Sequence, residues 1–391
     1  MELIKRPIHY TQEGKSIFDQ FYLDEDYNVP EQKDDVRRII QGSAECRTED
    51  IRPVENYVKV IGKIYFRILY MTSSGDPKPA VLEGSVPFEE MVYAESDGNE
   101  TFFIRSMRTE FTGSVVNSRK LSLRIMAELE IGRERLRDEE LTADVESDIP
   151  VYRKMEKMNL LKLAVSRKDT YRIKEEIILP GTKESIGQVL LTDIGSRKLD
   201  IRLGQDEILL RGELLVFCMY LSSDEKTDWI EQSVPYEGRI SCDGVTESMY
   251  HHIRHSLEDT LADVRLDEDG EMRILGIEGT LALRMNIYEE EETEVLRDMY
   301  SLEQVCEFDT RDVVYEELLM QNQSRCKVSE RLALPELKED VLQILHSQGS
   351  IQMESEQHTD GGIRVEGILH LSFLYLRGDD MEPYGSWQGI L

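Results

Sequence analysis

Residues 208–221 read ILLRGELLVFCMYL, and the chain repeats this phrase as VKVIGKIYFRILYM at residues 58–71 and IRVEGILHLSFLYL at residues 363–376. Aliphatic and aromatic residues dominate each copy, a composition that predicts a buried β-strand. A glycine at the fifth position of all three predicts a bulge or a close backbone approach within that strand. The recurrence indicates a fold built from repeats of one unit.

A second repeated phrase comes before each of these strands and contains a proline and a lysine. It reads NVPEQKDDVRRII at residues 28–40, ILPGTKESIGQVL at residues 178–190 and ALPELKEDVLQIL at residues 333–345. Its prolines lie 150 and 155 residues apart, as do the glycines and the tyrosines of the strand phrase. Together with the proline of a Val-Pro-aromatic return strand in two copies, the anchors of the repeat are Pro30, Lys33, Gly62, Tyr70, Pro87, Pro180, Lys183, Gly212, Tyr220, Pro235, Pro335, Lys338, Gly367 and Tyr375.

A repeat of this length corresponds to a domain rather than to a solenoid unit. We therefore predict one β domain at residues 1–150, a second at residues 151–308, and a partial third at residues 309–391. The third copy stops inside a hairpin strand, before the strands that would cover its core. We expect the sequence to be a fragment for this reason.

Spacing within each copy predicts several strands and one short helix. Apolar residues alternate before the anchor proline, as at Ile173, Ile177 and Leu179, which is typical of a strand. After the proline the spacing changes to three and four, as at Val36, Ile39 and Ile40, which predicts a short helix. Residues 153–165, RKMEKMNLLKLAV, are interpreted as a linker helix that leads into the second copy.

The later strands of the first two copies also match. In KLSLRIMAELEI and MRILGIEGTLAL, residues Leu123 and Leu275 each begin a period-two series of apolar residues, and we align the two series on this pair. The fold class predicted is therefore mainly β, or β-rich α+β. It consists of tandem antiparallel sandwich or barrel-like domains, each with a short helix after the anchor proline.

Composition excludes several classes of function. The chain has 78 acidic and 47 basic residues and a formal charge of −31, which repels nucleic acids and anionic lipid surfaces. It contains no apolar run of about 18 residues and no secretory signal, so we predict no membrane span. Its cysteines occupy non-equivalent places in the repeats, which favours free thiols in a reducing cytoplasm. They are Cys46, Cys218, Cys242, Cys306 and Cys326.

The histidines that could bind a metal do not follow the repeat, whereas three carboxylates do. His251 and His255 are four apart, with His252 between them, which would suit zinc on a helix face, but no cysteine or acidic residue stands at a ligand spacing. We interpret this segment as solvated surface. The recurrent Glu25, Glu175 and Glu330 are interpreted as structural, since they lie on an otherwise apolar face in every copy.

The sequence contains no Gly-rich phosphate loop, no nucleophile elbow and no Cys/His pair in a useful context. We predict no catalytic residues, no metal and no cofactor, and hence no enzyme. Trp229 and Trp387 lie beside the return strand where the first copy has Val81 and Leu82. They are candidates for an interaction surface or for packing across strands.

The opening MELIKRPI, the Pro-x-x-Lys-acid anchor, the Gly-centred strand that ends in a tyrosine and the Val-Pro-aromatic return resemble the SPOCS-domain family of clostridial sporulation proteins. SipL-like members of this family carry tandem copies before a C-terminal LysM module. The resemblance implies a spore coat morphogenetic protein in the mother-cell cytoplasm, at the forespore surface. It also implies partnership with the coat ATPase SpoIVA, and no catalytic residue transfers.

The function predicted is a non-enzymatic interaction scaffold in endospore formation, which helps to attach and encase the spore coat around the forespore. Contact with peptidoglycan is expected only if a LysM module follows Leu391. The alternative is a carbohydrate-binding or carbohydrate-active β protein of the cell envelope. That class favours an export signal and equivalent exposed aromatics or acid pairs in every copy, and the sequence has neither.

Overall fold

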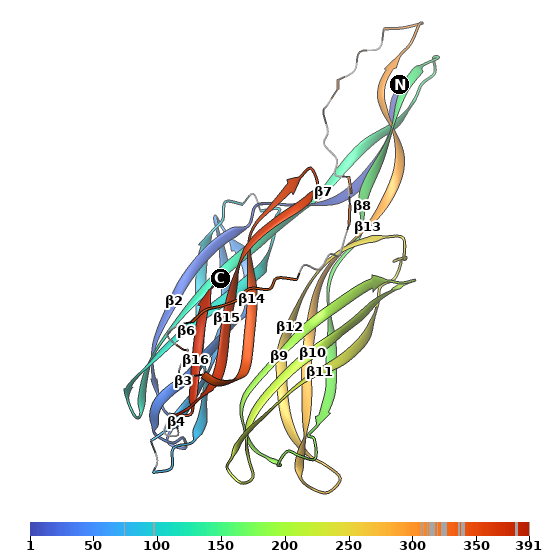
Figure 1. Cartoon of the computed structure of the whole chain (residues 1–391). Coiled ribbons are helices and arrows are strands. Elements are labelled where there is room, and N and C mark those ends of the chain that lie inside the picture. The colour runs from blue at the N-terminus through green and yellow to red at the C-terminus, as the bar shows by residue number, and fades with distance from the viewer. Residues whose placement is uncertain are drawn as a thin grey trace.

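A computed structural model of the chain consists of long antiparallel β-strands (Figure 1). The structure describes residues 1–73, 75–96, 98–305, 307, 309–310, 312, 317–318, 320–321, 327–334, 337, 341–379 and 382–390. Four residues named in the predictions lie outside this part of the chain: the anchors Pro335 and Lys338, and the cysteines Cys306 and Cys326. Within it, every helix or strand element is a strand, which confirms a mainly β fold and contradicts its α component.

The first copy is a two-layer β structure. One layer is a four-stranded sheet in which β7 pairs with β1, β2 and β6, and the other is a three-stranded sheet in the order β3-β4-β5. The strands are β1 (Glu2–Glu13), β2 (Ile17–Asn28), β3 (Val36–Val54), β4 (Tyr57–Thr72), β5 (Pro79–Tyr93), β6 (Thr101–Asn117) and β7 (Lys120–Glu146). A core with buried Val58, Ile64 and Ile125 includes residues of both layers.

The second copy repeats these two layers with the orders β12-β13-β8 and β11-β10-β9. Its strands are β8 (Tyr152–Ile178), β9 (Ile186–Leu203), β10 (Glu207–Ser222), β11 (Thr227–Ser241), β12 (Tyr250–Leu266) and β13 (Met272–Tyr300). The third copy contributes one sheet in the order β14-β15-β16. Its strands are β14 (Val341–Thr359), β15 (Gly362–Arg377) and β16 (Tyr384–Ile390).

The predicted helix after the anchor proline is wrong, because β-bulges produce the same spacing. In the first copy the chain turns after Pro30 and enters β3 at Val36. The pairing of β3 with β4 skips Arg37 and Ile40, and the pairing of β9 with β10 skips the residues 150 positions later. Each bulge inserts one residue and so turns a period of two into spacings of three and four.

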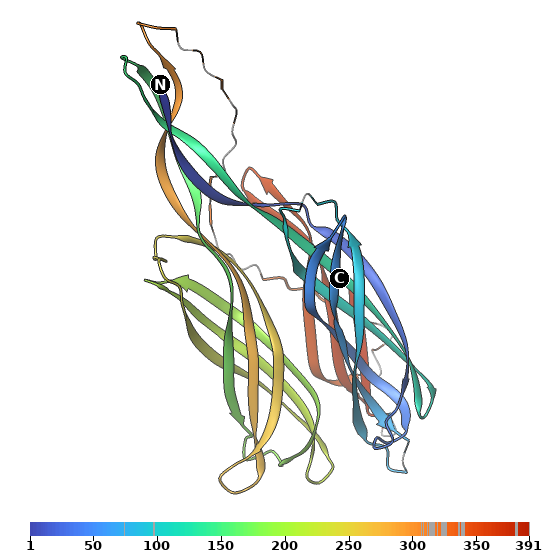
Figure 2. The ribbon, with the colours of Figure 1, turned by 180° about the vertical axis from the view of Figure 1, so that it is seen from behind.

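The predicted linker helix is also wrong. Residues 153–165 lie in β8, which runs unbroken beside β13. This part of β8 belongs to an arm that extends beyond the two sandwiches, where β1 pairs with the end of β7 and the start of β8 pairs with the end of β13 (Figures 1 and 2). Ile8, Leu141 and Leu160 form a small buried cluster in the arm. A strand with so little burial shows no period of two, which is why its sequence resembled a helix.

Strand pairing corrects one further alignment. Asn28 pairs with Lys120, and Ile178, its equivalent 150 residues later, pairs with Ile274. The equivalent of Leu123 is therefore Ile277 rather than Leu275. The prediction had the correct face of the strand and was displaced by two residues.

Candidate interaction site

In the first two copies, the turn that follows the anchor proline is held by an arginine that the repeat pattern did not reveal. Arg119 donates hydrogen bonds to the carbonyl oxygens of Val29, Pro30 and Lys33, at 3.1, 2.8 and 2.6 Å. In the second copy, Arg273 donates to the equivalent carbonyls of Leu179, Pro180 and Lys183, at 3.4, 2.8 and 2.8 Å. A guanidinium spreads five N–H donors over a rigid planar fork and so reaches carbonyls that lie apart, whereas the three donors of an ammonium group radiate from one nitrogen. The two arginines therefore fix the turn that leads into β3 in the first copy and into β9 in the second.

The recurring tyrosine binds the same turn from inside the core. The hydroxyl of Tyr70 donates to the carbonyl of Asp34 at 3.1 Å, and that of Tyr220 donates to the carbonyl of Glu184 at 3.5 Å. Both side chains are completely buried, and burial raises the pKa of each phenol to about 12. The anchors thus connect the turn to the sheet.

The recurring glycine permits close backbone contact, as the sequence predicted. A Cβ atom on Gly62 would lie 2.2 Å from the carbonyl oxygen of Arg47, and one on Gly367 would lie 2.4 Å from that of Gln352. The pairing of β3 with β4 shifts register beside Gly62. At Gly212 the obstacle is the ring of Tyr236, 2.6 Å from such a Cβ.

The three copies meet through equivalent residues. The bulge residues Ile40, Leu190 and Leu345 are all buried in one apolar cluster, which we call the inter-repeat cluster. The other buried members are Leu69, Met71, Phe217, Met219, Leu221, Leu374 and Tyr384. Leu69, Met219 and Leu374 also occupy equivalent positions, so each copy offers the same sheet face to the others. The bulges turn a side chain to this face and thereby create the contact.

Polar contacts around the cluster connect the copies in a closed cycle. Copy one meets copy two where Arg67 on β4 donates to the hydroxyl of Thr192 on β9, at 2.8 Å. Copy two meets copy three where His346 on β14 lies 2.8 Å from Asp193, and the imidazole also stacks on Phe217 with ring centroids 4.1 Å apart. Copy three returns to copy one where the hydroxyl of Ser386 on β16 donates to the carbonyl of Ile40 at 2.6 Å. Each copy therefore contacts both others.

A buried ion pair joins the first two copies at the base of the arm. Glu134 on β7 accepts a hydrogen bond from Arg284 on β13, and the side chains are 9% and 16% exposed. The Arg284 guanidinium lies 4.2 Å from the ring centroid of Phe103, whose ring also has Arg254 at 4.9 Å. Such a pair fixes geometry between copies more than it adds stability.

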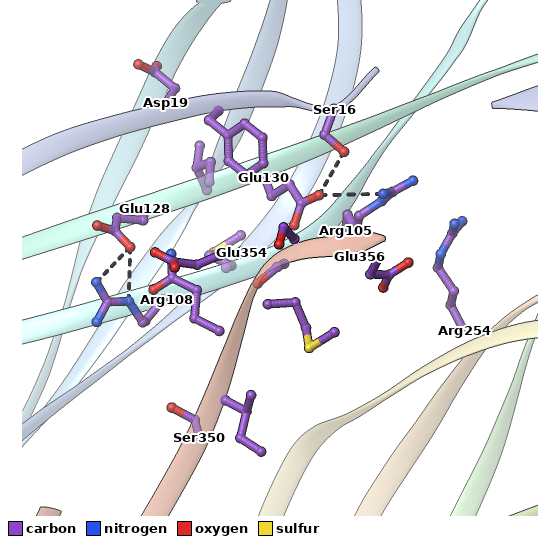
Figure 3. Close-up of a pocket in the computed structure, with 18 of the residues that line it drawn as sticks. Ser16, Asp19, Arg105, Arg108, Glu128, Glu130, Arg254, Ser350, Glu354 and Glu356 are labelled. Carbon is purple, nitrogen blue, oxygen red and sulfur yellow. Dashed lines mark hydrogen bonds and ion pairs between the residues drawn. The ribbon is translucent and has the colours of Figure 1, made fainter. Parts of the chain in front are cut away.

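A polar groove of about 1170 Å³ opens between the three copies (Figure 3). Its walls come from β2, β6 and β7 of the first copy, β12 of the second and β14 of the third. Three arginines line it, and each has carboxylate partners: Arg105 contacts Glu13 at 2.7 Å, Arg254 contacts Glu13 at 2.6 Å, and Arg108 contacts Glu128 at 2.7 Å. Burial favours the neutral form of Glu13, but the hydrogen bond and charge of Arg254 outweigh it and lower the pKa. The cations are therefore committed to internal ion pairs.

The structure does not bring the candidate histidines together as a metal site. His251 and His255 share one side of strand β12, rather than the helix face that the zinc hypothesis required, and burial lowers the pKa of each. Within the described residues, no three His, Cys, Asp or Glu side chains could hold a metal ion together. The same described residues contain no helix that is long and apolar enough to cross a membrane. Among the recurrent carboxylates, Glu175 is half-buried, and Glu25 and Glu330 are exposed.

The two tryptophans lie on opposite faces of their sheets. Trp229 pairs with Met219 and packs on the inter-repeat cluster, with the ammonium of Lys183 5.3 Å from its ring centroid. Trp387 pairs with Phe373 on the other face of its sheet, and the two rings stack at 5.1 Å. Only Trp387 therefore points away from the inter-repeat cluster.

Residues 185–265, which begin within the anchor turn and include β9, β10, β11 and most of β12, match the family model described as SipL, SPOCS domain. The chain contains a SPOCS domain. The match confirms the resemblance predicted from the anchors and links the chain to sporulation. No curated protein and no solved structure matches the chain. The SPOCS match begins five residues after Pro180, so it covers the strand phrase of the second copy and the return strand.

Proposed function

We propose that this protein is a non-enzymatic interaction scaffold in endospore formation that helps to attach and encase the spore coat around the forespore. The observation that carries the proposal is the SPOCS domain at residues 185–265. The repeat anchors extend the same design to residues 1–150 and 309–391, which we propose as a complete and a partial domain of the same kind. The second domain then spans residues 151–308.

The assembly of the copies supports a scaffold. Equivalent faces meet in the inter-repeat cluster, and the closed cycle of contacts holds surfaces of all three copies in a fixed relation. Fixed, repeated surfaces suit multivalent binding, in which several weak contacts add up to high avidity. We propose a SpoIVA-like coat ATPase as the protein partner, and the mother-cell cytoplasm at the forespore surface as the location.

Two experiments test this function. A fluorescent fusion of the chain should accumulate around the forespore in sporulating cells, and a pull-down from those cells should recover coat proteins. The comparison variant is Leu374→Asp, which places a charge in the inter-repeat cluster. It should separate the third copy from the other two and so reduce the recovery of coat proteins. Diffuse fluorescence, or retention of glycans without any coat protein, would refute the proposal.

A further inference from the structure

Each of the first two copies has one sheet edge that no described strand pairs with. In the first copy β2 pairs only with β7, and in the second copy the equivalent part of β8, residues 167–178, pairs only with β13. We call these strands the β2 edge and the β8 edge. At the opposite edges of the two sheets, β6 contacts the third copy through Arg108 and His370, and β12 contacts the first copy through Arg254 and Glu13. The β2 and β8 edges therefore lie on the sides of their sheets away from these contacts between copies.

The outward side chains of the two edges are complementary. On the β2 edge, Phe18 and Tyr22 are 73% and 58% exposed and lie four residues apart on the outer face. On the β8 edge, exposed Lys168 and Arg172 occupy the equivalent positions, 150 residues later. A cation is attracted to the face of an aromatic ring. The repeat thus places aromatic rings on one edge and cations, with the same spacing, on the other.

Each edge is a poor partner for an edge of its own kind. Two β8 edges in antiparallel pairing would bring Lys168 of each strand close to Arg172 of the other, and like charges directly opposite are destabilising. The β2 edge has no basic residue, and its carboxylates are those of Asp19, Asp24, Glu25 and Asp26. Two β2 edges would bring both sets of carboxylates together. Charge therefore favours pairing between unlike edges.

We infer that the β2 edge of one molecule pairs in antiparallel fashion with the β8 edge of a second molecule of this protein. One register suits the side chains on the outer face: Phe18 lies opposite Arg172, and Tyr22 then lies opposite Lys168. Main-chain hydrogen bonds between the two open edges supply the affinity, as in other cases of strand addition. Because the two edges are different surfaces, every molecule keeps one of each after pairing, and the assembly grows as an open chain.

The net charge of the protein leaves room for this contact. Each molecule has a formal charge of −31, but repulsion between exposed charges is screened beyond about 8 Å at physiological ionic strength. The paired edges are closer than this distance, and there the cations of the β8 edge meet rings and carboxylates. The inference rests on the strand edges and does not depend on the proposed role in sporulation.

Sedimentation equilibrium of the whole chain measures the assembly. Its average mass should rise with protein concentration beyond the mass of a dimer. Substituting Phe18→Lys together with Tyr22→Lys places cations opposite cations and should weaken association at least tenfold. Adding Lys168→Glu and Arg172→Glu to that variant places opposite charges at both positions and should restore association. The control is Tyr57→Lys, which changes an exposed tyrosine on the central strand β4 and should leave association unchanged.

Disulfide trapping identifies the paired edges. In the inferred register Gln20 lies opposite Thr170, so a mixture of the Gln20→Cys and Thr170→Cys proteins should form a disulfide between these positions under mild oxidation, detected by peptide mass spectrometry. Lys174→Cys is the matched control, because it lies four residues further along the same edge and should cross-link at least tenfold less. A mass that stays at one chain, a charge exchange that fails to restore association, or a disulfide between two Gln20→Cys chains would each overturn the inference.

Discussion

The substitution Leu374→Ala tests whether the third copy is held by the inter-repeat cluster. Leu374 is completely buried there, and the side chains of Ile363 and Val365 on the opposite face of the sheet are 64% and 53% exposed, so the cluster supplies much of the apolar burial of this sheet among the described residues. Truncating a buried leucine to alanine costs about 2–5 kcal/mol. A loss of about 3 kcal/mol corresponds to about two factors of ten in an equilibrium constant, at 1.4 kcal/mol for each factor. Local opening of β14, β15 and β16 should therefore become about a hundredfold more frequent.

Hydrogen exchange measured by mass spectrometry reads this opening sheet by sheet. Peptides from β14, β15 and β16 should lose about a hundredfold in protection, and those from β10 and β13 should keep theirs. The matched control is Leu69→Ala, the equivalent position in the first copy. Its sheet also packs on the core that contains Val58 and Ile64. The amides of β4 should therefore keep their protection against exchange and open only when the whole domain unfolds. Unchanged protection in β15, or equal loss in all three copies, would refute the reasoning.

Three further predictions concern single residues. Arg119→Ala should lower the free energy of unfolding, measured by urea denaturation, by about 2 kcal/mol, because three turn carbonyls lose a charged donor. Arg119→Lys should restore little of this loss, and full rescue by lysine would contradict the role of the planar guanidinium. Burial raises the pKa of the Cys218 thiol to about 12, so iodoacetamide at pH 8 should label Cys218 only in denaturant. Peptide mass spectrometry measures the labelling, and rapid labelling of the native protein would contradict the burial of this thiol. Burial also lowers the pKa of His251 below its usual 6.5, so the stability that the neutral imidazole contributes is present above that value and is lost as the pH falls through the folded-state pKa. The Tm of the protein should therefore fall from pH 7 to pH 5, and it should fall less steeply in His251→Gln. An identical slope in the variant would show that His251 does not cause the pH dependence.

The sequence predicted the repeated strands because their burial leaves a direct pattern. The phrase around Gly212 is rich in aliphatic and aromatic residues because β10 is buried on both faces, by its own core and by the inter-repeat cluster. The recurring glycine was correctly assigned, to a close backbone approach at Gly62 and to a shift of register at Gly212. Short-range patterns of this type require no knowledge of distant contacts.

The failures arose where bulges or distant contacts set the pattern. Ile40 and Leu190 looked helical because each is an inserted residue, which changes the spacing without ending the strand. The capping arginines escaped notice because the two late strands were aligned two residues out of register. Correct alignment puts Arg119 and Arg273 in the same place, 154 residues apart, and this was the available signal. The meeting of three copies through one face depends on tertiary packing, which no local pattern records.

A double-mutant cycle on His346 and Asp193 tests most directly whether the three copies form one closed body. The two side chains lie 2.8 Å apart across the contact between copies two and three, and His346 is 6% exposed. Substituting each by alanine, alone and together, and measuring the opening of β14 by hydrogen exchange should give a coupling energy of about 1 kcal/mol. Effects that simply add, to within about 0.3 kcal/mol, would contradict the contact and with it the closed arrangement.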